Sequence, residues 1–105
     1  MNKRRTLDLN LLVAFDALME ERSVSRAAKA LGRSQPAVSN ALARLRETFH
    51  DELLVRSGTG MKPTPAALQA HGAVKAALAG IDDALAEARV FAPERDRRRF
   101  RVAMA

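Results

Sequence analysis

The sequence predicts a mainly α-helical fold in which three short helices and a small β-hairpin precede one long helix. Hydrophobic residues make up 48% of the 105 residues, but aromatic residues make up only 4%, and alanine is abundant. This balance suits closely packed helices better than sheets. Apolar side chains also recur at helical spacing along most of the chain. A chain of this length forms one small domain or part of a larger protein.

The first helix is predicted between Asp8 and Arg22. Asp8 or Asn10 can accept hydrogen bonds from the free amides at its start. Apolar residues then recur three and four positions apart, which gives the helix one face for the core. These residues are Leu11, Leu12, Phe15, Leu18 and Met19.

A second, shorter helix and a third helix follow, separated by a short turn with one glycine. Ser23 or Ser25 can cap the second helix, and Gly32 after it tolerates a positive φ angle. Ser34 can cap the third helix, which extends to about Thr48. The residues predicted to face inward are Ala27, Ala28, Leu31, Val38, Ala41, Leu42, Leu45 and Phe49. The three helices are therefore expected to share one small core.

A β-hairpin is predicted next, because two β-capable segments, 53–56 and 61–63, flank a glycine-rich turn at 57–60. Thr64 followed by Pro65 is then a strong signal for a helix start, since proline at the first helical position loses no hydrogen bond. The hairpin would thus stand between the third helix and a fourth.

The fourth helix is predicted from Thr64 to Phe91 and carries apolar residues at heptad-like spacing. Three short helices cannot cover a helix of this length, which favours a dimer seam over an ordinary core helix. The seam consists of Val74, Leu78, Ile81, Leu85 and Ala88. Beyond Pro93, the apolar alternation in residues 100–104 is typical of a strand, which suggests the front part of a longer protein.

Residues 24–43 have the pattern of a helix-turn-helix motif, with small Ala28 at the helix crossing and Gly32 at the turn. The second helix of such a motif lies in the DNA major groove and contacts bases and phosphates near its start. If its apolar residues face the core, a spacing of about 100° per residue sends a largely polar set outward or to the flanks. On the predicted recognition helix 34–48, this set comprises Gln35, Pro36, Ser39, Asn40 and Arg44.

This set suits the chemistry of DNA. Glutamine and asparagine can pair with both N6 and N7 of adenine, while serine hydroxyls and free amides at a helix start suit phosphate oxygens. Pro36 presents a flat apolar surface that can meet a thymine methyl group. Arg56 and Lys62, on either side of the hairpin turn, can reach an adjacent minor groove or the backbone. The net charge of +6 also favours a polyanion or an acidic membrane surface as partner.

Several other functions are not expected. The basic N-terminus resembles a signal peptide at first, but Asp8, Asn10 and Asp16 interrupt its apolar run, so neither export nor a membrane span is predicted. Cysteine is absent, which excludes thiolate metal sites and makes the cytoplasm the natural compartment. His50 and His71 lack partners at metal-ligand spacing, so surface or capping roles are favoured and no metal is expected. Because no serine has a matched histidine and carboxylate, an enzyme is not predicted.

The stretches "SVSRAAKALGRSQPAVSNALARLRETF" and "DELLVRSGTGMKPTPAA" resemble the DNA-binding end of LysR-type transcriptional regulators. The resemblance covers nearly the whole chain and implies a winged helix-turn-helix domain over 1–63 with its wing at 53–63. It also implies a linker and dimerisation helix over 64–92, then a hinge and the first strand of an effector-binding domain over 93–105. Residues 95–101 could form a second phosphate patch, but a solvated hinge is favoured. The start of the chain is similar to the branch containing nodulation regulators and regulators of aromatic degradation.

The resemblance carries functional positions over to Ser34, Gln35, Pro36, Ser39, Arg56 and Thr64. Two positions depart from the family pattern. Many members have arginine or lysine where Asn40 stands, so the base preference there is open. Many have an apolar residue where Arg33 stands. Arg33 can lay its stem on the core and direct its guanidinium to a phosphate, which is a hypothesis about additional nonspecific affinity.

The sequence as a whole predicts a transcription regulator that binds double-stranded DNA at an inverted-repeat operator as a homodimer. The resemblance implies that the intact protein senses a small-molecule inducer through a domain beyond this chain, so no cofactor is expected here. It leaves open whether the full-length protein forms a tetramer. A cytoplasmic, nucleoid-associated location would follow. The alternative is a helical protein-interaction module without DNA binding, and the two hypotheses differ at Gln35, Ser39 and Asn40.

Overall fold

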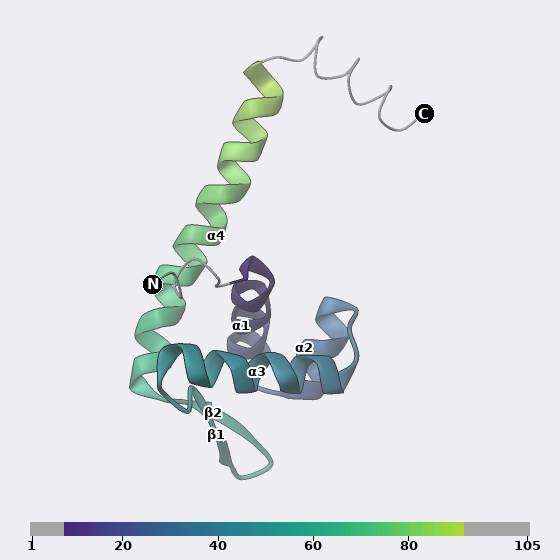
Figure 1. The fold of residues 1–105 in the computed structure, drawn as a ribbon, viewed down its shortest axis with the longest axis vertical. Coiled ribbons are helices and arrows are strands. Elements are labelled where there is room, and N and C mark those ends of the chain that lie inside the picture. The colour runs from purple at the N-terminus through teal and green to yellow at the C-terminus, as the bar shows by residue number, and fades with distance from the viewer. Residues whose placement is uncertain (1–7, 92–105) are drawn as a thin grey trace. The chain divides into compact units, whose positions relative to one another are not determined.

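A computed structural model describes residues 8–91, which form three helices, a two-stranded hairpin and a long helix (Figure 1). The elements in chain order are α1 (Leu9–Glu21), α2 (Val24–Leu31), α3 (Gln35–Phe49), β1 (Leu54–Ser57), β2 (Gly60–Pro63) and α4 (Pro65–Phe91). The predicted fold class is therefore confirmed. The hinge and strand predicted over 93–105 lie outside the described residues.

Each helix begins at a side chain that accepts a hydrogen bond from a backbone amide in its first turn. The capping residues are Asp8, Ser23, Ser34 and Thr64. Of the alternatives that the sequence allowed, Asn10 and Ser25 lie inside their helices. A side-chain acceptor at this position satisfies an amide that has no partner within the helix. The local sequence signals therefore place the helix starts correctly.

The first three helices end at residues with a left-handed backbone. The cap after α2 is Gly32, with φ of 68°, as its position in the sequence predicted. Arg22 after α1 and His50 after α3 adopt φ angles of 53° and 54° although they are not glycines. His50 thus has the capping role that was one of its two predicted roles.

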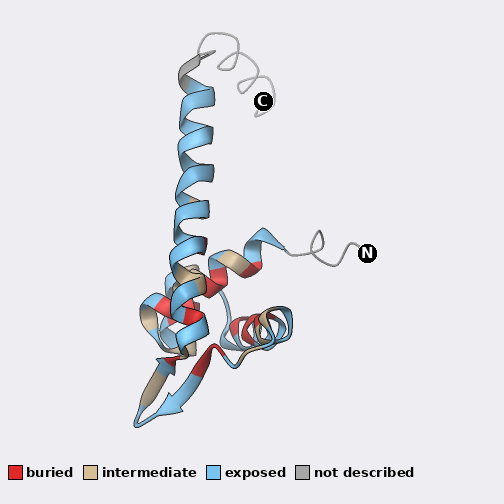
Figure 2. Cartoon of the chain, turned by 90° about the vertical axis from the view of Figure 1, so that its left-hand side faces the viewer, coloured by how far each residue is buried: buried red, intermediate tan, exposed pale blue. Residues whose placement is uncertain are grey.

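The core lies where α1, α2 and α3 meet, and Figure 2 shows its buried residues gathered on these helices and at the base of the hairpin. Phe15 is fully buried and stacks on Phe49, with ring centroids 5.5 Å apart. Phe49 and Leu31, both predicted to face inward, are only half-buried. The fully buried residues with the largest side chains are Phe15, Leu18, Leu45, Leu53, Leu54 and Val38.

Leu53 has an unusual backbone for a buried leucine. Its φ angle is 66°, in a region that bulky residues rarely adopt. Successive side chains of a regular strand alternate between two faces, yet Leu53 and Leu54 are both fully buried. The left-handed turn of the backbone at Leu53 allows two consecutive side chains, that of Leu53 and that of the first residue of β1, to enter the core.

The described part of the chain divides into two units, residues 8–75 and residues 76–91, with the division inside α4. Val74 is only 8% exposed and belongs to the core of the first unit, as does Ala67. The prediction that Val74 forms part of a free seam therefore needs correction, because its surface is already covered within the chain. Among residues 76–89 none is buried, and Ile81 and Leu85 are 41% and 57% exposed.

No helix within residues 8–91 combines the length and hydropathy that a membrane crossing needs.

Candidate nucleic-acid interface

The front of α3 presents a polar surface backed by a buried apolar stripe. Val38, Leu42 and Leu45 are buried, and the contact residues predicted on this helix and its cap all lie exposed on its remaining surface. Those residues are Ser34, Gln35, Pro36, Ser39, Asn40 and Arg44. Ser34 Oγ accepts a hydrogen bond from the Ala37 amide at 3.2 Å, which leaves its hydroxyl proton available to a ligand. The arrangement of α3 is the one that its helical spacing predicts.

A group of basic residues lies beside the start of α3, and two of its members were not predicted from the sequence. Arg26 and Lys29 of α2 join Arg33 and Gln35 around a shallow depression of about 430 Å³. Arg26 is partly held in place, because its Nη2 donates to the Glu21 carbonyl at 2.7 Å. The three-residue step between Arg26 and Lys29 on the polar face of α2 is a signal that could have revealed them.

The hairpin places its two predicted basic contacts on opposite faces. β1 and β2 pair antiparallel, with Leu54 opposite Pro63, Val55 opposite Lys62 and Arg56 opposite Met61. Side chains that face each other across a ladder share a face, and neighbours along a strand do not. Arg56 therefore lies on the face of buried Leu54, whereas Lys62 lies on the other. Both are exposed, but the sequence alone did not separate their directions.

An open groove of about 530 Å³ runs between α3 and the hairpin, and we call it the α3–hairpin groove. It brings together Ser39 of α3 and Arg56 of β1, two residues that were predicted as DNA contacts from separate parts of the chain. The other lining residues are Val24, Leu42, Arg46, Glu52, Leu54, Val55 and Met61. A serine hydroxyl and a guanidinium on the two sides of one groove suit an anionic ligand.

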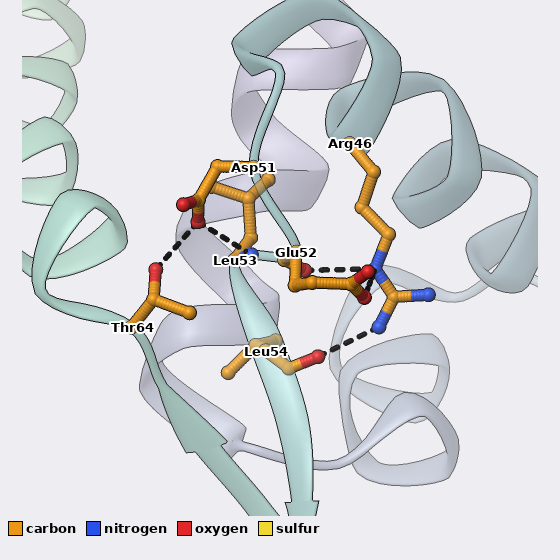
Figure 3. Close-up of polar contacts among 6 residues, drawn as sticks. All are labelled: Arg46, Asp51, Glu52, Leu53, Leu54 and Thr64. Atoms are coloured by element: carbon orange, nitrogen blue, oxygen red, sulfur yellow. Dashed lines mark hydrogen bonds and ion pairs between the residues drawn. The ribbon is translucent and has the colours of Figure 1, made fainter.

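Arg46 crosses this groove and holds its two walls together (Figure 3). Its Nε donates to the Glu52 carbonyl at 2.7 Å, and its Nη2 donates to the Leu54 carbonyl at 2.6 Å. The Glu52 carboxylate adds an ion pair at 3.7 Å. The guanidinium thus joins the second half of α3 to the first residue of β1.

Asp51 makes a second connection at the base of the hairpin, also drawn in Figure 3. Its Oδ2 accepts from the Thr64 hydroxyl at 2.6 Å and from the Leu53 amide at 2.8 Å. These two hydrogen bonds, that of Thr64 first, hold the pKa of the Asp51 carboxyl below its usual value. The Thr64 amide in turn donates to the Leu53 carbonyl at 2.9 Å, so Leu53 is held from both sides.

Thr64 was among the predicted DNA contacts, but the structure gives its hydroxyl another role. The hydroxyl donates its proton to Asp51 and accepts from the Ala67 amide at 3.1 Å. Because a hydroxyl has one proton to donate, none remains for a phosphate oxygen. Thr64 therefore caps α4 and ties its start to Asp51, and its hydroxyl is not expected to contact DNA.

His71 has neither the surface role nor the capping role predicted from the sequence, since it lies inside α4 and is mostly covered. Its Nε2 lies 2.7 Å from Asp16 Oδ1 and its ring meets Phe15 edge-on, with its side chain only 14% exposed. Glu20 lies nearby and binds Lys75 Nζ at 3.0 Å, a contact that lowers the pKa of the Glu20 carboxyl and raises the pKa of Lys75. Asp16, Glu20 and His71 are close enough to share a cation, but the Lys75 ammonium already pairs with this group.

The helices and hairpin define a winged helix-turn-helix domain, and comparison with known proteins agrees. Residues 9–68 match the model of the bacterial regulatory helix-turn-helix proteins of the LysR family. The chain belongs to this family, whose members are transcription regulators and not enzymes.

Two regulators illustrate the similarity. The chain is 54% identical to the regulator LeuO of Escherichia coli over 77% of its length and 26% of that protein. It is 48% identical to nodulation protein D 1 of Bradyrhizobium elkanii over 94% of its length and 32% of the relative. The chain thus spans about a quarter to a third of the length of these curated relatives.

A solved structure supports the fold. The crystal structure of the BenM DNA-binding domain with benA site 1 DNA matches with a TM-score of 0.77 and 27% identity. The match covers 84% of this chain and 99% of that one. The BenM domain thus provides a structural neighbour solved with DNA.

Proposed function

We propose that this protein is a sequence-specific transcription regulator that binds an inverted-repeat operator as a dimer, with α3 in the major groove. The observation that carries the proposal is the exposed polar front of α3 above buried Val38, Leu42 and Leu45. A recognition helix needs this division, because one face must hold the core while the other meets base edges. The similar BenM domain was solved in complex with DNA, which supports a DNA-binding role for this domain.

The exposed residues of α3 divide into base and backbone contacts. Gln35 and Asn40 can each pair with an adenine edge in the major groove, and Pro36 can meet a thymine methyl group. Ser34 and Ser39 suit phosphate oxygens, as do the free amides at the start of α3. These assignments predict that base discrimination comes from amide side chains more than from charge.

The basic residues around α3 would supply affinity that does not depend on sequence. Arg33 and Arg44 flank the helix and are exposed, and Arg56 lies in the α3–hairpin groove. Lys62, on the other hairpin face, would reach the backbone or an adjacent minor groove. Each phosphate that such a residue neutralises steepens the dependence of binding on salt.

A dimer would double the contacted sequence, and α4 offers the surface for it. Leu78, Ile81, Leu85 and Ala88 follow one stripe of α4, and the last three are exposed. Two recognition helices about one DNA turn apart would then read an inverted repeat. The full-length protein would be cytoplasmic and would respond to a small molecule bound outside this chain.

Selection of bound sequences from a random DNA pool at a stated salt concentration tests the proposal. Enrichment of an inverted repeat is expected, and Asn40→Ala should weaken binding to that site by about 1 to 3 kcal/mol with little effect on random DNA. Asn10→Ala is a matched control, because it makes the same change at an exposed position of α1. Failure to enrich any sequence would favour the protein-interaction module instead.

A further inference from the structure

Arg46 differs from the other charged residues of α3 in what its side chain contacts. Arg44 and Glu47 are exposed, whereas the Arg46 side chain is partly covered, with 36% of it exposed. Two of its N–H groups donate hydrogen bonds to backbone carbonyls. A guanidinium is planar and presents its donors in a fixed fork. Two hydrogen bonds from one fork therefore fix both the distance and the angle between α3 and the start of β1.

The Leu54 carbonyl is well suited to accept from Arg46. Leu54 stands opposite Pro63 at a non-hydrogen-bonded position of the antiparallel ladder, since the Thr64 amide donates to the neighbouring Leu53 carbonyl, so the Leu54 carbonyl points away from β2 and can accept from Arg46. An isolated two-stranded hairpin is only marginally stable in water. The hairpin therefore depends on anchors at its base, and Arg46 is the anchor that comes from the recognition helix.

The position of this anchor bears directly on the α3–hairpin groove. Arg56 lies two residues beyond Leu54 on the same strand face, and the groove it lines also contains Ser39 of α3. Any rotation of β1 about its base would change the separation of Arg56 from Ser39. Resting on the proposed function, we infer that Arg46 is a positioning residue that holds the hairpin so that Arg56 and α3 bind the same DNA segment together.

A double-mutant cycle tests this inference on the operator obtained from the selection. Arg56→Ala is expected to reduce the salt slope of binding by about 1, as loss of one phosphate contact does. Arg46→Lys keeps the charge but lacks the planar fork, and it should reduce the slope by a similar amount. In the Arg46→Lys background, Arg56→Ala should then have little further effect. Full additivity of the two changes, or an unchanged slope in Arg46→Lys, would overturn the inference.

Two further measurements separate positioning from general stability. Glu52→Gln removes the ion pair but keeps both carbonyl acceptors, so Arg56→Ala should retain its full effect in that background. NMR order parameters of the amides in residues 54–62 should fall in Arg46→Lys without DNA, whereas those of α2 should not. Unchanged hairpin order parameters would contradict the role of Arg46, and this test does not depend on DNA. Absence of DNA binding by the wild-type protein would refute the proposed function instead.

Discussion

The carboxylate of Asp51 lies 2.6 Å from the hydroxyl of Thr64 and 2.8 Å from the amide of Leu53. This single group therefore connects the segment between α3 and β1 with the residue that caps α4. Because Thr64 also caps α4 and donates its amide to Leu53, the two ends of the hairpin are closed by one small network.

Asp51 should make stability depend on pH in the acidic range. Its pKa is lowered in the folded state, so the unfolded chain takes up a proton first as the pH falls. The stabilisation is present above the usual pKa of an aspartate, about 4, and is lost as the pH falls through the lowered folded value. Urea unfolding should show Asp51→Asn less stable than wild type at pH 7, with a difference that shrinks towards pH 3. Asp82→Asn at an exposed position of α4 is the control, and a constant difference for Asp51→Asn would contradict this account.

Removal of the Thr64 hydroxyl should destabilise the domain. Thr64→Val retains the shape of the side chain but deletes the cap of α4, which alone costs about 1 kcal/mol. Thr64→Ser keeps a hydroxyl and should recover most of the free energy of unfolding. Thermal and urea unfolding of both variants measure this. Equal stability of the two variants would show that the hydroxyl does not act as the structure indicates.

Truncation of Phe15 should be among the most damaging changes in the core. Phe15 is fully buried between Phe49 and His71, and Phe15→Ala is expected to lower the free energy of unfolding by about 3 to 5 kcal/mol. Val13→Ala on the exposed side of α1 provides the comparison and should change it by far less. Chemical denaturation followed by circular dichroism distinguishes the two; similar losses would mean that Phe15 is not central to the core.

Charged substitutions on the exposed stripe of α4 should disrupt a dimer. Ile81→Lys combined with Leu85→Lys would place two ammonium groups on the proposed seam. Sedimentation at micromolar concentration should then show a monomer, with wild type a dimer. Ala79→Lys lies on the opposite side of the helix by its spacing and should leave the dimer intact. A monomeric wild-type chain would refute the seam outright.

The sequence predicted the elements well because their signals are local. Ser23, Ser34 and Gly32 lie within one turn of the helix ends that they define, and their side chains or backbone act on neighbouring residues. The outward residues of α3 followed from the helical period, and they are exposed as expected. Their contacts with DNA remain a prediction.

The connections that place the hairpin could not be predicted in the same way. In the sequence, Arg46 resembles any other solvated charge on α3. Only the folded structure shows that its guanidinium donates to the carbonyls of Glu52 and Leu54. Asp16 and His71 are 55 positions apart, and only the packing of α4 against α1 makes them partners. Val74 likewise fits a heptad-like seam, but tertiary packing takes it into the core.

The left-handed backbone at Leu53 also limits how the wing can slip. A slip of β1 by one residue would expose the side chain of Leu53 or Leu54 to water. Exposing a buried leucine costs about 1.5 to 3 kcal/mol. The same slip would move Arg56 to the other face of the hairpin. The unfavourable φ angle of Leu53 thereby helps to fix the register of the strands, and the register in turn fixes the direction of the basic side chains.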